Sequence, residues 1–233
     1  MAGYGILIRN ADGDILIDGE HPHPILHEEE TIELPAGSYG GMFFIRTFKT
    51  PSPYPLIVAW HSENAWIHMS SLTKRDNQEW SSMHLKVPVW QGPASATYRA
   101  YACPMPVPSM GGYGIDIFNS SGLRVFSGSQ PTLRVHAMGM ERVHHSNPQH
   151  VVYFPPTDKK PFIFVATQGL KFCRFDPGHP DFPNYNYIPF IGPVLKNDDG
   201  LWDRFMMGGT IWDNALGLNG GYDIFPLPYV VFT

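Results

Sequence analysis

The sequence has few cysteines, few charges and no long apolar run. Its 233 residues include two cysteines, Cys103 and Cys173. Neither belongs to a C-x-x-C pair, which excludes a zinc ribbon, and two cysteines make no disulfide framework, although whether they pair stays open. Only 16% of the residues are charged and basic runs are missing, which argues against nucleic-acid binding. The apolar stretches are as short as Phe162–Ala166, so no membrane-spanning helix and no membrane insertion are expected.

Helical periodicity is almost absent as well. The chain contains 23 glycines and 23 prolines, and the best helical window, Leu72–Val87, has no clean apolar stripe. A hydrophobic content of 43% excludes a disordered chain. Short β-branched and aromatic runs between turn residues predict strands instead. The expected strands are Tyr4–Arg9, Asp14–Asp18, Gly41–Phe48, Pro55–Trp60, Ala65–Met69, His84–Trp90, Ala96–Tyr101, Tyr113–Phe118, Leu123–Ser127, Thr132–His136, His150–Phe154, Phe162–Thr167, Lys171–Phe175 and Tyr222–Phe232.

An internal repeat is the most informative feature of the sequence. Residues 3–22 and 112–131 align without a gap at an offset of 109 residues, and His27 pairs with His136 at the same offset. Such self-similarity indicates a duplicated structural unit. The identical pairs are Gly3/Gly112, Tyr4/Tyr113, Gly5/Gly114, Ile6/Ile115, Ile8/Ile117, Asn10/Asn119, Gly13/Gly122, Gly19/Gly128 and Pro22/Pro131.

Each copy of the repeat predicts a β-hairpin. In the first copy Tyr4, Ile6 and Ile8 alternate onto one face of a strand, and a tight turn follows. Asn10 begins that turn by bonding back to the backbone, and Gly13 can take a positive φ. The residues that define strand and turn in both copies are Tyr4, Gly5, Asn10, Gly13, Tyr113, Gly114, Asn119 and Gly122.

The hairpin resembles the opening segment of small virion proteins of long-tailed bacteriophages, with its pattern of Tyr-Gly-apolar-x-apolar-x-Asn-x-x-Gly. The resemblance covers about twenty residues in each copy, and in the second copy Ser127 stands where the family pattern has Asp. It implies a structural component of a tail tip or baseplate. The expected partners are therefore other tail proteins, in several copies per virion, and the expected location is the virion tail after synthesis in the host cytoplasm. The resemblance transfers no catalytic residue.

Together these features predict an all-β protein of two β-sandwich or barrel-like domains, residues 1–111 and 112–233, each opening with the repeated hairpin. The leading function is assembly through protein–protein contacts. The alternative is a receptor- or carbohydrate-binding module that contacts the host surface. The candidate contact residues are aromatic or lie in the stiff Pro-rich segment 176–189: His179, Phe182, Tyr185, Tyr187, Trp202 and Trp212.

No catalytic site, metal site or cofactor is expected. The acidic run Glu28–Glu30 is interpreted as a solvated turn, and no nucleophile or nucleotide motif is present, although two acids of a hydrolase would escape detection. Residues 10–14 resemble part of a calcium loop, but the second copy keeps the turn and loses the acidic ligands. The histidines His21, His23 and His27 are expected to be solvated, and they are the first place to look for a metal.

Overall fold

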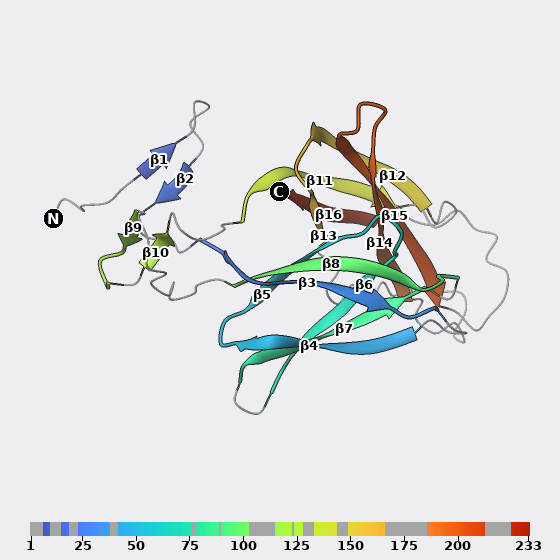
Figure 1. Cartoon of the computed structure of the whole chain (residues 1–233), viewed down its shortest axis with the longest axis horizontal. Coiled ribbons are helices and arrows are strands. Elements are labelled where there is room, and N and C mark those ends of the chain that lie inside the picture. The colour runs from blue at the N-terminus through green and yellow to red at the C-terminus, as the bar shows by residue number, and fades with distance from the viewer. Residues whose placement is uncertain are drawn as a thin grey trace, which may run out of the picture.

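The computed structural model describes residues 7–9, 15–18, 23–37, 42–75, 78–88, 90–102, 115–122, 124–127, 133–143, 149–165, 186–212 and 225–233. All regular structure in these residues is β-strand, and all strand pairs are antiparallel (Figure 1). The all-β prediction is therefore confirmed.

Sixteen strands are described, eight in each half. Those of the first half are β1 (Leu7–Arg9), β2 (Ile15–Asp18), β3 (Ile25–Leu34), β4 (Met42–Ser52), β5 (Leu56–His61), β6 (His68–Lys74), β7 (Trp80–Val87) and β8 (Ala94–Ala102). Those of the second half are β9 (Asp116–Phe118), β10 (Arg124–Ser127), β11 (Val135–Val143), β12 (Gln149–Thr157), β13 (Phe162–Val165), β14 (Asn186–Lys196), β15 (Trp202–Trp212) and β16 (Phe225–Phe232).

The strands form three larger sheets and two separate hairpins. One sheet has six strands in the order β11-β16-β13-β5-β8-β3, and two sheets have three strands each, β4-β7-β6 and β12-β15-β14. In the view of Figure 1 both hairpins, β1-β2 and β9-β10, lie at the same end of the molecule. The hairpin β9-β10 is linked to the segment before β3, because the His23 N–H donates to the Val125 carbonyl at 3.0 Å.

The strand order of the second half repeats that of the first. Raising each strand number by eight converts β3-β8-β5 into β11-β16-β13 and β4-β7-β6 into β12-β15-β14. Even an irregularity recurs: the pairing of β3 with β8 skips His27, and the pairing of β11 with β16 skips His136. We call two residues equivalent when they hold the same register position in the two halves, as His27 and His136 do.

Equivalent strands also join the two halves. In the six-stranded sheet β13 pairs with β5, with Ile163 opposite Trp60. The equivalent of Ile163 is Val58, and the equivalent of Trp60 is Val165. In the same antiparallel register Val58 and Val165 also lie opposite each other. The other sheets meet where Ile67 and Ile191 exchange two backbone hydrogen bonds of 2.8 Å. Such reciprocal contacts are those of an approximate twofold axis between the halves.

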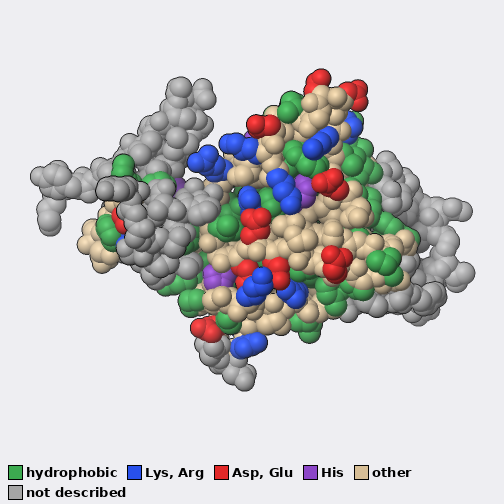
Figure 2. Space-filling view, viewed as in Figure 1, with side chains coloured by type: hydrophobic (Ala, Val, Ile, Leu, Met, Phe, Trp, Pro, Cys, Tyr) green, Lys and Arg blue, Asp and Glu red, His purple; other side chains and the backbone are tan. Residues whose placement is uncertain are grey.

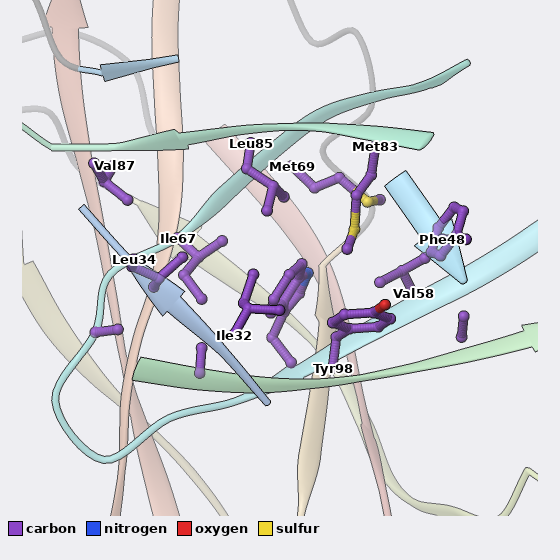
Figure 3. Packing of buried hydrophobic residues seen from close by; sticks show 14 of the residues in the cluster. Ile32, Leu34, Phe48, Val58, Ile67, Met69, Met83, Leu85, Val87 and Tyr98 are labelled. Atoms are coloured by element: carbon purple, nitrogen blue, oxygen red, sulfur yellow. The ribbon is translucent and has the colours of Figure 1, made fainter. Parts of the chain in front are cut away.

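Each half buries apolar side chains between two sheets. In the first half, residues of β3, β5 and β8 face residues of β6 and β7 across the core (Figure 3). The labelled members of this core are Ile32, Leu34, Phe48, Val58, Ile67, Met69, Met83, Leu85, Val87 and Tyr98. The second half has a matching core around Phe154, Ile163 and Phe205. Both halves are thus sandwiches that share one continuous sheet.

Some sequence expectations need correction. The interpretation of Glu28–Glu30 as a solvated turn is wrong, because all three residues lie in β3 and Glu28 is buried. In the window Leu72–Val87, which has no clean apolar stripe, the described residues form the end of β6 and the whole of β7. Strands β14 and β15 were not expected. The expected strand Lys171–Phe175 and the domain boundary at 111/112 lie outside the described residues, so the two-domain division stays a prediction.

Candidate functional site, an apolar patch on the second half

The turn between the last two strands of each three-stranded sheet is the same in both halves. Lys74 and Lys196 end the preceding strands, and their ammonium groups lie 4.9 and 4.6 Å from the ring centroids of Trp80 and Trp202. These pairs belong to a second sequence repeat, Lys-x-Asp-x-x-x-Trp, at an offset of 122 residues. This repeat cannot be found at the offset of 109 residues that aligns the hairpins. Cation–π contacts retained in both halves point to a structural role.

The skipped histidines are structural too. The Nε2 atom of His27 lies 2.7 Å from the Thr50 carbonyl, and Nε2 of His136 lies 2.7 Å from the Pro155 carbonyl. The two rings therefore tie β3 to β4 and β11 to β12, which in each half belong to different sheets. Among the described residues no three His, Cys, Asp or Glu side chains lie close enough to hold a metal ion.

An acidic cluster occupies the interior beside β3. The buried Glu28 accepts hydrogen bonds from the Tyr98 hydroxyl and from the backbone N–H groups of Lys49 and Thr50, the last two at 2.9 and 3.3 Å. Glu30 accepts from Arg46 and Tyr98. The hydrogen bond from Arg46 holds the pKa of Glu30 below its usual range, and burial raises the pKa of Tyr98. Both carboxylates are already saturated by donors, which suits anchoring β4 more than proton transfer.

The second half replaces this cluster with small and apolar groups. Ala137 and Gly139 are equivalent to Glu28 and Glu30, and Tyr229 is equivalent to Tyr98. The Tyr229 hydroxyl fills the space beside Gly139, where a Cβ atom would lie only 2.6 Å from it. The two halves therefore keep one fold while their polar chemistry differs.

The outer face of the six-stranded sheet shows the largest difference. In the first half Arg99 Nε donates to Glu29 Oε2 at 2.7 Å, and the Thr31 and Thr97 hydroxyls lie 2.9 Å apart. Figure 2 shows acidic and basic side chains intermingled over the centre of the face where β3 and β8 lie. These pairs are polar and suited to water.

At the equivalent positions the second half is apolar. Met138 is equivalent to Glu29 and its side chain is 72% exposed. Met140 is equivalent to Thr31 and its side chain is 66% exposed. Their cross-strand neighbours are Val230 and Pro228 in place of Arg99 and Thr97. We call Met138, Met140, Pro228 and Val230 the apolar patch. Large exposed methionines in a group are a feature of protein-binding surfaces.

Strand β12 adds apolar groups near the same edge. It contacts β11 and carries the exposed Val151 and Tyr153, the latter 65% exposed. The equivalent residues on β4 are Ile45, which is also exposed, and Thr47. Tyrosine is enriched in interfaces because it offers a large contact area and a hydroxyl at low entropic cost. At the positions compared on the two strands, the second half therefore has Met138, Met140 and Tyr153 where the first half has Glu29, Thr31 and Thr47.

Buried ionisable groups lie at two places near the junction of the halves. His61 is 3% exposed, and its Nδ1 atom lies 2.8 Å from the Pro161 carbonyl. Burial lowers the pKa of His61 to about 4, so the ring is neutral near pH 7. Opposite each other on β6 and β7 lie the buried His68 and Lys86, and burial lowers the pKa of Lys86 to about 8.

The described structure places few of the contact residues expected from the sequence. Trp202 is only 8% exposed and packs against His61 with a centroid distance of 4.9 Å, so its ring lies in the core and not on a surface. Tyr187 and Trp212 are described by their backbone in β14 and β15. The others, His179, Phe182 and Tyr185, lie outside the described residues.

The hairpin turn is described in its second copy. Asn119 Oδ1 accepts from the Ser121 N–H at 3.0 Å, and its carbonyl accepts from the Gly122 N–H at 2.9 Å. Gly122 has a φ of 75°, a conformation that favours glycine. The other repeat residues, Tyr4, Gly5, Asn10, Gly13, Tyr113 and Gly114, and also His21, lie outside the described residues.

Comparison with protein-family models, with curated proteins and with solved structures finds no match for this chain. Within the described ranges, no helix has the length and apolar character needed to cross a membrane. The internal comparison between the two halves is therefore the most direct guide to the functional surface.

Proposed function

We propose that the protein is a structural component of a bacteriophage tail tip or baseplate and acts by binding neighbouring subunits. The observation that carries this proposal is the apolar patch, which has a polar counterpart at the equivalent place in the first half. The tail assignment itself is supported by the resemblance of the duplicated hairpin. Contacts with other tail proteins in the virion are the proposed mode of action.

The energetics of the patch favour a partner. Burying one methionine side chain contributes about 1.5–3 kcal/mol, so two exposed methionines leave a substantial driving force unused in the isolated chain. The first half shows that the fold itself does not require apolar groups there, because Glu29 and Thr31 fill the same positions. The methionines are therefore better explained by binding than by folding.

The polar clusters support binding in preference to catalysis. The two carboxylates of the acidic cluster are held by five donors in total, which come from side chains and backbone. A general acid or nucleophile needs access to a substrate, whereas Glu28 is buried and the partly exposed Glu30 is held in an ion pair with Arg46. Receptor or carbohydrate binding was expected from segment 176–189 and stays a prediction, since most of that segment is not described.

The test is to locate the chain in particles and then to alter the patch. Purified particles from cultures that make the protein are analysed by mass spectrometry and single-particle imaging. We expect a fixed stoichiometry near the tail tip. The double variant Met138→Glu with Met140→Thr gives the second half the residues of the first, and it should reduce incorporation at least tenfold, because it removes about 3 kcal/mol or more of apolar burial.

The matched control changes the equivalent positions of the first half. The double variant Glu29→Gln with Thr31→Ser keeps those positions polar and should be incorporated like the wild-type chain. Absence of the wild-type protein from particles would refute the tail assignment. Equal incorporation of both double variants would show that the apolar patch is not the assembly surface.

A further inference from the structure

Within the part of the chain that the structure describes, strand β11 is an edge strand whose chemistry differs from that of the opposite edge. It is the last strand of the six-stranded sheet, and β3 is the last strand at the other end. Edge strands can pair with another chain, and proteins commonly protect them with charges. Strand β3 carries four glutamates, whereas β11 carries Glu141 and Arg142 near its end and no charge in residues 137–140, Ala-Met-Gly-Met.

The sequence of β11 is complementary to itself around Gly139. If two copies of β11 pair antiparallel with Gly139 opposite Gly139, then Met138 of one copy faces Met140 of the other, and Ala137 faces Glu141. Each such cross-strand pair has Cβ atoms about 4.5–5.5 Å apart, so the methionines would shield one another. A twofold contact requires this reciprocity, because residue i meets j and j meets i.

The same operation on β3 would be unfavourable. Pairing centred on Glu30, the equivalent of Gly139, would place Glu30 of one copy opposite Glu30 of the other, and like charges directly opposite each other across a strand pair are destabilising. The register shift at His136 interrupts the pairing of β11 with β16. The pairing is regular only from Ala137 onwards, a stretch that includes Met138, Gly139 and Met140. The central part of the proposed contact therefore coincides with the exposed methionines.

The molecule already contains one junction of this type. Strands β5 and β13 are equivalent, and they pair antiparallel about the approximate twofold axis between the halves. We propose that a second copy of this chain binds at β11, so that the two six-stranded sheets continue into one another about an exact twofold axis. This inference rests on the proposed assembly role of the apolar patch and names its first partner.

The affinity should be modest. One pair of short strands buries less than the roughly 800 Å² per partner of a standard stable interface, so a micromolar dissociation constant is expected. Sedimentation equilibrium of the purified full chain between about 1 and 300 µM should show a monomer–dimer equilibrium. The variant Met138→Glu with Met140→Thr should weaken the dimer at least tenfold, while Ile45→Thr, at the equivalent of Val151, should leave it unchanged.

Cross-linking tests the register. Chains with Met138→Cys mixed with chains carrying Met140→Cys should form a disulfide-linked dimer under mild oxidation. Chains with Met138→Cys alone should form less, and the wild-type chain controls for Cys103 and Cys173. A wild-type chain that stays monomeric, or a dimer insensitive to the double variant, would overturn the inference. If such a monomer still enters particles, the proposed tail function stands and only the partner is wrong.

Discussion

Acid should weaken the fold through His61, the buried histidine at the junction of the halves. Its ring packs against Trp202 and Phe162, with centroid distances of 4.9 and 5.9 Å. Burial, and to a smaller degree the nearby positive charge of Lys160, lowers the pKa of His61 from 6.5 to about 4, against the opposing effects of the Pro161 carbonyl and Glu63. Protonation would place a buried charge between two aromatic rings, with only the exposed carboxylate of Glu63, 4.0 Å from Nε2, to offset it.

The sign and size of the effect follow from the two pKa values. Because the pKa is lower in the folded chain, the unfolded chain takes up the proton first as the pH falls. The stability that this group supports is therefore complete above about pH 6.5 and is lost as the pH falls towards 4. Between pH 7 and 4.5 the free energy of unfolding should decrease by roughly 2–2.5 kcal/mol on account of His61 alone.

The assay is urea unfolding followed by tryptophan fluorescence at both pH values. The variant His61→Asn keeps an N–H group that can donate to the Pro161 carbonyl but does not titrate. Its loss of stability between pH 7 and 4.5 should be smaller than that of the wild-type chain by about 2 kcal/mol. The control His84→Asn alters a histidine of β7 and should behave as wild type. Equal pH dependence of all three proteins would refute the argument.

Two further predictions concern backbone and packing. Gln78 and Gly200 occupy equivalent turn positions with φ of 67° and 79°, so Gln78→Gly should raise the free energy of unfolding by about 0.5–1 kcal/mol, whereas Gly200→Gln should lower it by about 1 kcal/mol in urea titrations. If both variants changed the free energy of unfolding in the same direction, the assignment of residues 78 and 200 to equivalent turn positions would be contradicted. Gly192→Ala should lower the stability by about 1–3 kcal/mol in thermal melts, because its Cβ would lie 2.7 Å from the Trp66 ring and 2.8 Å from Met206 Cβ. Gly92→Ala is the matched control, since nothing lies within 4 Å of its added Cβ, and an equal loss there would rule out the packing explanation.

The fold class could be predicted from the sequence because most strands consist of short β-branched and aromatic runs. Strand β3 could not, since its run of glutamates is typical of a solvated turn. The structure accommodates Glu28 and Glu30 in the interior by giving them Tyr98 and Arg46 as partners, and these partners come from other strands. Contacts between distant segments are invisible to a local pattern.

The duplication could have been followed further than the hairpins. The Lys-x-Asp-x-x-x-Trp repeat is present in the sequence, but its offset of 122 residues reflects the longer segment that follows β13 in the second half. The apolar patch could not be predicted from the sequence for another reason. Alternating methionines predict a strand face turned towards a core, whereas here Ala137 and Gly139 face inward, because Tyr229 fills the space between the sheets.

The joining of the two halves in one chain has a consequence for how the surface can change. In a dimer of identical chains every mutation appears twice, once on each side of the axis. A mutation that lets one edge strand pair with another chain would therefore create two such edges, and the dimers could then form open-ended polymers. Here the gene specifies each side separately. One edge can keep its glutamates while the other gains methionines, and growth then stops after a single addition. Duplication followed by fusion thus provides a scaffold with two ends that evolve independently.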